Sequence, residues 1–178
     1  MKIIVIGDCS VGKTNLILRY AQNQFMSQQH ATIGLSHITK NIDDLSVKVQ
    51  LWDTAGEEKF RSITRSYYNN AEVGLIVFDL NNEESLKSSE LWLTEFTSQA
   101  PEALAIIVGN KADLTKACDG KSMAEKYGLN YFEVSALTGN GVEQMFNQTI
   151  EEAAKKDKRE GAEQVINTQK SDIKSGCC

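Results

Sequence analysis

Apolar residues form continuous runs at three places in the chain, Ile3–Ile6, Val73–Phe78 and Ala103–Val108. Short runs of this kind, without polar residues in alternation, are typical of strands that are buried on both faces. We therefore expect parallel strands in a sheet that helices cover.

Between these runs, apolar residues recur with the spacing of a helix. Two groups each share one helix face: Leu16, Ile17, Tyr20 and Ala21 near the start of the chain, and Val142, Met145, Phe146, Thr149, Ile150 and Ala153 in the last helix. The order of strand and helix is mostly β-α-β, which predicts an α/β domain.

One region breaks this order. Ile38–Ile42 leads into the turn-forming pair Asp43-Asp44, and Val47, Val49 and Leu51 then alternate with polar residues. This pattern predicts an antiparallel hairpin at the edge of the sheet, so the sheet is expected to be mixed.

The composition indicates one domain with an appendage. The chain has 178 residues, 41% of them hydrophobic, and apolar periodicity stops at Asp157, so we expect a domain at 1–156 and a flexible tail at 157–178.

The net charge of −5 disfavours a nucleic-acid partner. The apolar run after Lys2 is too short for a signal peptide or a spanning helix, and the spacing of the cysteines fits neither a zinc site nor a disulfide framework. We therefore expect a cytosolic protein in which Cys9 and Cys118 are free thiols.

The stretch GDCSVGKT, at Gly7–Thr14, fits the phosphate-loop pattern and lies between a predicted strand and a predicted helix. Backbone N–H groups of such a loop converge on phosphate oxygens at the helix N-terminus. Gly7 and Gly12 allow the bend, Lys13 neutralises phosphate charge and Thr14 binds Mg²⁺. An ordinary strand-to-helix turn with a surface lysine is the weaker alternative.

The stretch NKAD, at Asn110–Asp113, follows the predicted strand Ala103–Val108 at the carboxyl edge of the sheet, where open parallel sheets bind ligands. A buried carboxylate at Asp113 can accept hydrogen bonds from N1–H and the 2-amino group of guanine, and adenine offers no such donor pair. Alone, this stretch would be interpreted as a solvated loop. Together with the phosphate loop, it predicts a guanine-nucleotide site and argues against an ATP-using phosphoryl transferase.

These motifs resemble the small GTPases of the Ras superfamily over most of the chain, from Met1 to about Lys156. Several stretches are similar to Rab proteins in particular: KVQLW (48–52), KFRSIT (59–64), Tyr67-Tyr68, IVFDLNNEES (76–85) and Cys177-Cys178. The resemblance implies the P-loop NTPase fold of a G domain, with a six-stranded mixed sheet flanked by helices.

The resemblance also implies roles for individual residues. The implied nucleotide-binding residues are Asp8, Cys9, Ser10, Val11, Gly12, Lys13, Thr14, Asn15, Phe25, Thr32, Gly56, Asn110, Lys111, Asp113, Ser135, Ala136 and Leu137. The implied magnesium ligands are Thr14, Thr32 and Asp53, and the implied catalytic residues are Lys13, Thr32, Gly56 and Glu57. Phe25 would pack on the guanine, the Ser135-Ala136 backbone would meet its oxygen, and Thr32 and Gly56 would contact the γ-phosphate.

Three positions depart from the family pattern. Glu57 stands where the family has a glutamine that positions the attacking water, and an ionised glutamate can only accept hydrogen bonds, so we expect very slow intrinsic hydrolysis. Leu137 stands where a lysine is common, so we expect weaker packing on the base. His37 replaces a phenylalanine of an effector-facing aromatic cluster with Trp52 and Tyr67, and we interpret it as a solvated surface residue.

By resemblance, the chain is a GTP/GDP switch that regulates vesicle trafficking. Its implied partners are an exchange factor, a GTPase-activating protein, a GDP dissociation inhibitor, the prenylation machinery and effectors. We expect a monomer on the cytoplasmic face of an intracellular membrane, with a cytosolic pool, anchored by lipids on Cys177 and Cys178 because two chains give stable attachment. A GTP-locked, membrane-bound scaffold with negligible hydrolysis is the alternative that Glu57 leaves open.

Overall fold

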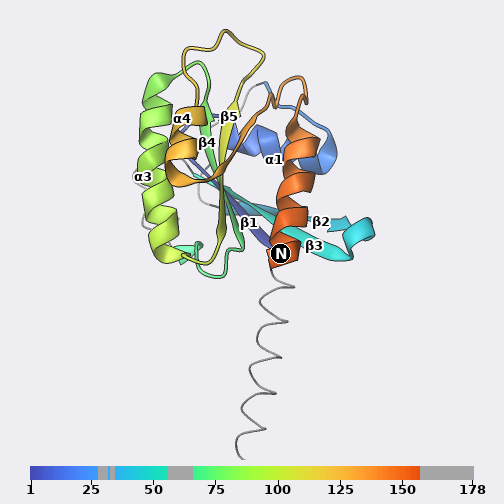
Figure 1. Ribbon diagram of the computed structural model, residues 1–178. Coiled ribbons are helices and arrows are strands. Elements are labelled where there is room, and N and C mark those ends of the chain that lie inside the picture. The colour runs from blue at the N-terminus through green and yellow to red at the C-terminus, as the bar shows by residue number, and fades with distance from the viewer. Residues whose placement is uncertain (28–31, 33–34, 56–65, 157–178) are drawn as a thin grey trace, which may run out of the picture.

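A six-stranded sheet with the strand order β2-β3-β1-β4-β5-β6 forms the centre of the computed structural model (Figure 1). The structure describes residues 1–27, 32, 35–55 and 66–156. β2 pairs antiparallel with β3, and the other neighbouring strands of this sheet pair in parallel. The predicted mixed sheet with one antiparallel edge hairpin is confirmed.

The strands are β1 Lys2–Ile6, β2 Leu35–Ile42, β3 Val47–Thr54, β4 Val73–Asp79, β5 Leu104–Asn110 and β6 Asn130–Glu133. The helices are α1 Lys13–Gln22, α3 Glu83–Gln99, α4 Lys121–Tyr127 and a last helix at 142–156. A short 3-10 turn, η1 Asp43–Leu45, joins β2 to β3.

Two strand boundaries differ most from the prediction. β5 extends to Asn110, because Asn110 continues the parallel ladder opposite Asp79. The strand predicted from the apolar run ends at Val108, two residues before the polar Asn110. β2 begins at Leu35, because its pairing with β3 continues as far as Thr54.

Alternate side chains of β1 enter two separate cores. Ile3 and Val5 pack with α1 and the last helix, while Ile4 and Ile6 pack with α3 and α4. Figure 1 shows the two helix pairs on opposite sides of the sheet. Burying one such aliphatic side chain contributes about 1.5–3 kcal/mol, and all of these isoleucines and Val5 are 0% exposed. The strand predicted to be buried on both faces is therefore confirmed.

The predicted apolar helix faces are also buried. Leu16, Ile17 and Tyr20 of α1 belong to the first core, together with Phe146 of the last helix, whose ring stacks on Tyr20 at 4.2 Å. On the other side of the sheet, α3 begins at a regular N-cap, because the Asn82 side chain accepts hydrogen bonds from two backbone N–H groups of the first turn. Within the described part of the chain, no helix combines the length and the apolar character that crossing a bilayer requires.

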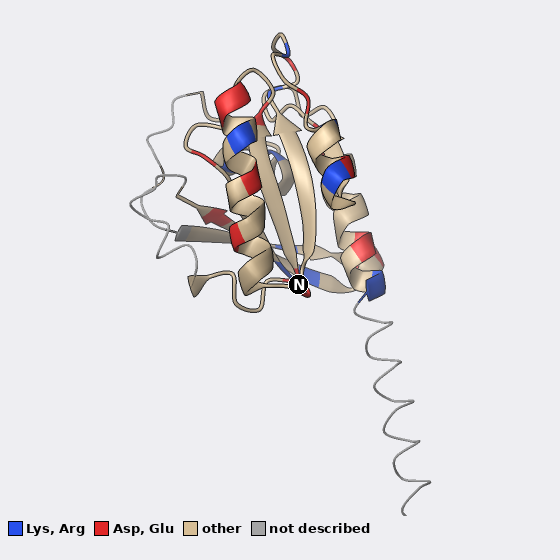
Figure 2. Cartoon of the chain, turned by 60° about the vertical axis from the view of Figure 1, so that its left-hand side comes forward, with Lys and Arg blue, Asp and Glu red and all other residues tan. Residues whose placement is uncertain are grey.

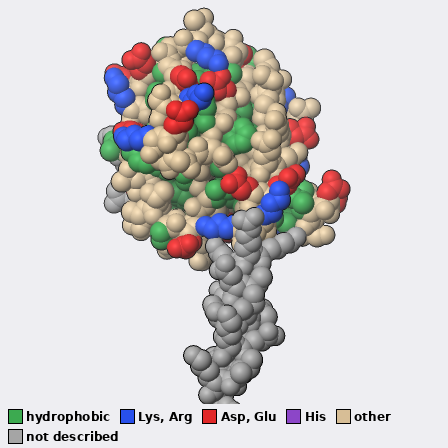
Figure 3. Space-filling view, in the orientation of Figure 1, with side chains coloured by type: hydrophobic (Ala, Val, Ile, Leu, Met, Phe, Trp, Pro, Cys, Tyr) green, Lys and Arg blue, Asp and Glu red, His purple; other side chains and the backbone are tan. Residues whose placement is uncertain are grey.

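Charged residues lie mainly on the helices, in the loops and near strand ends (Figure 2), while β1, β4 and β5 consist mostly of buried apolar residues. On the face seen in Figure 3, positive and negative side chains are interspersed. That face therefore offers no broad basic patch of the kind that nucleic-acid binding requires.

Candidate functional site

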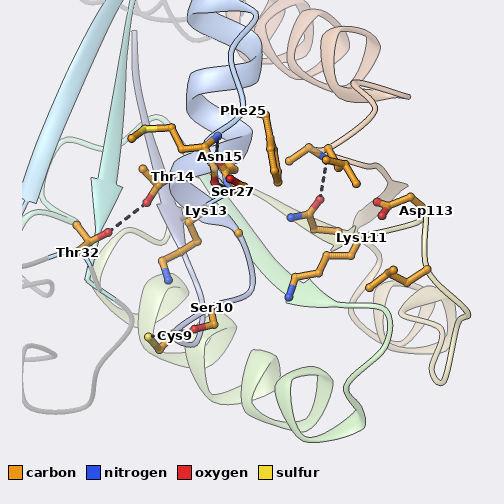
Figure 4. Close-up of a pocket in the computed structure, with 16 residues that line it drawn as sticks. Cys9, Ser10, Lys13, Thr14, Asn15, Phe25, Ser27, Thr32, Lys111 and Asp113 are labelled. Carbon is orange, nitrogen blue, oxygen red and sulfur yellow. Dashed lines mark hydrogen bonds between the residues drawn. The ribbon is translucent and has the colours of Figure 1, made fainter. Parts of the chain in front are cut away.

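A cavity of about 430 Å³ opens where the carboxyl ends of β1 and β5 meet the start of α1 (Figure 4). Its lining brings together most of the residues that the sequence predicted. They are Cys9, Ser10, Gly12, Lys13, Thr14, Asn15, Phe25, Thr32, Asn110, Lys111, Asp113, Ala136 and Leu137, joined by Met26, Ser27 and Leu114. Segments more than 100 residues apart in the sequence thus form one site.

Two glycines let the phosphate loop pass close to other elements. A Cβ at Gly7 would lie 2.1 Å from the Val77 carbonyl oxygen, and one at Gly12 would lie 2.4 Å from the Asn110 amide nitrogen. Both glycines also have positive φ angles, 147° and 95°. The loop therefore requires glycine at both positions, as the motif predicted.

Lys13 is a buried cation at the first position of α1. Its side chain is 6% exposed, and Nζ donates to the carbonyl oxygens of Gly7 at 2.9 Å and Asp8 at 2.7 Å. Burial lowers the pKa of Lys13 to about 8, and the nearby Asp53 carboxylate partly opposes this shift. The first turn of α1 contains no acidic residue. The helix N-terminus and the lysine together favour an anion here.

Thr14, Thr32 and Asp53 lie together beside this cation. The Thr14 hydroxyl donates to Asp53 Oδ2 at 2.7 Å and lies 3.1 Å from the Thr32 hydroxyl. Asp53 is 3% exposed, and its Oδ1 is buried without a hydrogen-bond partner among the described residues. Burial raises the pKa of Asp53, while the Thr14 hydrogen bond and Lys13 lower it. Oxygen donors and an unpaired buried carboxylate oxygen fit a hard cation such as Mg²⁺.

The base end of the cavity is more exposed than the sequence predicted. Asp113 is an exposed residue, so the prediction of a buried carboxylate is wrong for the protein alone. The carboxylate would become buried only when a base covers it. The Asp113 carboxylate accepts a hydrogen bond from Ser135 Oγ. Ser135 is 1% exposed and does not line the cavity, and its hydroxyl contacts the cavity only indirectly, through Asp113.

Asn110 joins the two ends of the site. Its amide nitrogen donates to the Val11 carbonyl at 2.8 Å, and its amide oxygen accepts from the Ala136 N–H at 3.1 Å. Asn110 is 1% exposed, and both polar atoms of its side-chain amide form hydrogen bonds with backbone groups. A guanine oxygen at the Ala136 N–H would have to share that donor with Asn110. The sequence did not predict this bridging role, because no spacing rule relates Val11, Asn110 and Ala136.

Apolar side chains surround the base end. Phe25 is 36% exposed, Met26 50%, Leu114 47% and Leu137 50%. Asn15 holds this rim in place, because its side-chain amide exchanges two hydrogen bonds with the Met26 backbone at 2.9 and 3.1 Å. A flat aromatic ligand would cover apolar surface that is now open to water.

Two predicted nucleotide-binding residues, Asp8 and Val11, do not line the cavity with their side chains. Val11 is 2% exposed and belongs to a core, and Asp8 Oδ1 accepts a hydrogen bond from the indole N–H of Trp92 at 2.7 Å. Lys111 does line the cavity, and its ammonium forms an ion pair with Asp79 at 2.7 Å. The partners Trp92 and Asp79 were not anticipated from the sequence.

The expected effector-facing residues form an aromatic row outside the cavity. The ring of His37 stacks on Trp52 at 5.0 Å, and Trp52 lies 5.8 Å from the Tyr67 ring. The Lys2 ammonium lies 4.8 Å from the centre of the Trp52 ring. His37 is exposed, as predicted, and the stacking of its imidazole on Trp52 is a contact that the sequence did not predict.

The remaining predicted site residues, Gly56, Glu57, Cys177 and Cys178, lie outside the described residues. Cys9 and Cys118 are free thiols, as expected.

Comparison with known proteins gives the family. Residues 2–155 match the sequence profile of the Ras family. Ras-related protein Rab-2B of Dictyostelium discoideum is 40% identical over 87% of this chain and 81% of its own length. Rab-11B of the same organism is 45% identical over 82% of this chain and 70% of its own length. RABA1c of Arabidopsis thaliana is 36% identical over 99% of this chain and 93% of its own length. The chain therefore belongs to the Ras family and is a Rab-type small GTPase.

Proposed function

We propose that this GTPase regulates vesicle trafficking by alternating between GTP-bound and GDP-bound states. The observation that supports this most is that one cavity joins a buried cation, Lys13, to a carboxylate, Asp113, with apolar side chains around the carboxylate end. A cation at one end suits phosphates, and a carboxylate at the other suits the N1–H and 2-amino donors of guanine.

In this proposal, the phosphates lie against the N-terminus of α1 and the Lys13 ammonium. Thr14, Thr32 and Asp53 would hold Mg²⁺, which neutralises phosphate charge when it is bound. Phe25 and Leu137 cover the guanine, and Asp113, oriented by Ser135, selects it. Thr32 also responds to the γ-phosphate in this proposal, because its hydroxyl lies beside that of Thr14, so loss of that phosphate would release the Thr32 side chain.

The bound nucleotide tests this proposal directly. We expect purified protein to carry GDP or GTP, identified by chromatography after denaturation, and to exchange it faster when EDTA removes divalent cations. Thr14→Ala should reduce the effect of EDTA, because it removes a proposed metal ligand. Bound ATP, or no bound nucleotide in the wild-type protein, would contradict the proposal.

We propose that Glu57 slows the intrinsic hydrolysis of GTP. Two like unit charges about 4 Å apart repel by about 4 kcal/mol at an effective dielectric constant near 20, so an ionised Glu57 would oppose the γ-phosphate. Intrinsic hydrolysis should fall below the order of 10⁻⁴ s⁻¹ that is usual for Ras without an activator. Single-turnover assays should show Glu57→Gln to be faster at neutral pH, and equal rates would contradict the repulsion. The family membership favours a switch over a GTP-locked scaffold, so Glu57 is proposed to tune the rate.

We further propose that Cys177 and Cys178 carry two lipid groups that anchor the protein to an intracellular membrane. The Rab relationship supports this, together with partners that include an exchange factor, a GTPase-activating protein, a GDP dissociation inhibitor and the prenylation enzymes. Effectors would meet the row formed by His37, Trp52 and Tyr67. Replacing both cysteines with serine should move the protein to the soluble fraction of a cell lysate with GTP binding unchanged. Continued pelleting of that variant with membranes would exclude the lipid anchor.

A further inference from the structure

Arg19 connects the end of α1 to the loop at the base end of the cavity. Its Nε donates to the Ala136 carbonyl at 2.9 Å, and Nη2 donates to the Leu137 carbonyl at 2.8 Å. Nη1 donates to the backbone and side-chain oxygens of Asn23 at 3.2 and 2.9 Å. One half-buried guanidinium thus ties two successive carbonyls, more than 100 residues away in sequence, to the C-terminal end of α1.

The loop that Arg19 holds is the one proposed to contact guanine. Ala136 and Leu137 both line the cavity, and the neighbouring Ser135 Oγ donates to the Asp113 carboxylate. The same loop is tied internally by the Gly139 N–H to the Ser135 carbonyl at 2.8 Å. Among the described residues, Arg19 and Asn110 provide the side-chain hydrogen bonds to the backbone of Ala136 and Leu137. The position of this loop relative to α1 therefore depends on Arg19.

The geometry requires an arginine in particular. Its planar fork offers several N–H groups at fixed angles, so it can reach two successive carbonyls and the helix end at the same time. A lysine ammonium is a point charge on a flexible chain and would reach fewer of these oxygens in one conformation. α1 begins at the phosphate loop with Lys13, so a single ten-residue helix links the two ends of the nucleotide site.

We propose that Arg19 is a positioning residue for guanine, which holds the Ala136–Leu137 loop over the base and so slows nucleotide release. This inference rests on the guanine site proposed above. The guanidinium does not contact the nucleotide, and it acts through the two carbonyls. Its loss should weaken the base contacts and leave the phosphate and metal contacts in place.

The test measures GDP dissociation, with a fluorescent GDP analogue, from wild-type, Arg19→Ala and Arg19→Lys proteins. We expect Arg19→Ala to release GDP about tenfold faster, with the same factor in Mg²⁺ and in EDTA, because the metal site is at the other end of the cavity. Arg19→Lys should fall between the two, since it restores the charge and part of the hydrogen bonding. The affinity of ADP, measured by competition, should change little, so the preference for GDP over ADP should fall about as much as GDP affinity does.

Two matched variants control for the loss of charge and of local contacts. Lys40→Met removes a cation whose ammonium donates to the Tyr20 carbonyl at 2.9 Å, and Lys40 does not hydrogen-bond to the base loop. Asn23→Gly removes one acceptor of Arg19 at a position with a φ of 54°, which glycine tolerates. Both should release GDP at nearly the wild-type rate.

The outcomes separate the possibilities. Unchanged GDP release in Arg19→Ala, or an equal loss of GDP and ADP affinity, would overturn the positioning role while leaving the guanine site intact. If Arg19→Ala does not fold, Arg19→Lys decides, because a release rate equal to that of the wild type would exclude a role for the fork. A wild-type protein that does not bind GDP would overturn the guanine site, and the role of Arg19 with it.

Discussion

The two ends of the nucleotide site differ in how they are built. At the phosphate end, Lys13 is 6% exposed and Asp53 is 3% exposed, and both are held by short hydrogen bonds within the protein. At the base end, Asp113 is exposed and Leu137 is 50% exposed. The phosphate end is thus formed by the core, and the base end is formed by loops that a ligand would complete.

This difference has an energetic consequence. Burying the Lys13 ammonium costs free energy in the protein alone, as its lowered pKa shows, and a phosphate anion would relieve that cost. At the base end, the exposed rings and aliphatic chains become buried only when a base covers them. Binding at the phosphate end is therefore electrostatic, while binding at the base end combines apolar burial with a few directed hydrogen bonds.

The largest expected effect comes from Lys13→Met, which removes the buried cation. GDP affinity should fall by about 30-fold or more, because truncating one partner of a buried charge pair costs about 2–5 kcal/mol. The nucleotide-free protein should unfold at the same or a higher urea concentration, since a desolvated charge is gone. Lys87→Met, at an exposed position of α3, is the control. A variant that is much less stable yet binds GDP normally would show that Lys13 is structural.

A smaller change is expected from Asp113→Asn at the base end. Each lost hydrogen bond to guanine should cost about 1–3 kcal/mol, or about 5–150-fold in GDP affinity. Affinity for xanthosine diphosphate should rise, because xanthine has a carbonyl where guanine has its 2-amino group. Competition titrations with both nucleotides measure the switch.

Ser135→Ala is the control for Asp113→Asn. It removes only the hydroxyl that donates to Asp113, so it should weaken GDP binding without any gain for xanthosine diphosphate. Unchanged GDP affinity in Asp113→Asn would remove this carboxylate from the guanine site.

A pH effect of about tenfold should be confined to the phosphate end. The pKa of Lys13 is about 8, below its usual value of 10.5, so the unfolded chain binds more protons between these values. The free energy of unfolding of the nucleotide-free protein should therefore rise as pH increases from about 7 to 10. GDP binding in EDTA should weaken about tenfold from pH 7 to 9, because phosphate prefers the ammonium form. Calorimetric titration and urea unfolding measure the two trends, and a flat unfolding profile would contradict the shift.

The same contrast explains what the sequence could predict. Buried strands, the α1 face and the phosphate loop were predictable, because each depends on local spacing and on one strand–turn–helix unit. The roles of Arg19, Asn110 and Trp92 were not, since each joins segments that only the fold brings together. The exposure of Asp113 and the stacking of His37 also escaped prediction, because both depend on neighbours that are distant in the chain.

The smallest expected effect concerns Leu137, whose half-exposed side chain lines the base end. Leu137→Lys adds a longer aliphatic stem that can lie along the base with its charge in water. GDP release should slow by about two- to fivefold. Repulsion between the new ammonium and the nearby Arg19 opposes this gain only weakly, because the site is exposed. Leu137→Ala should release GDP faster, and Leu137→Met should nearly match the wild type, because it keeps an apolar side chain of similar volume without adding charge. Stopped-flow dissociation of a fluorescent GDP analogue resolves these differences. If the lysine variant released GDP as fast as the alanine variant, coverage by this side chain would not contribute to base binding, and the apolar rim would owe its effect to Phe25, Met26 and Leu114 alone.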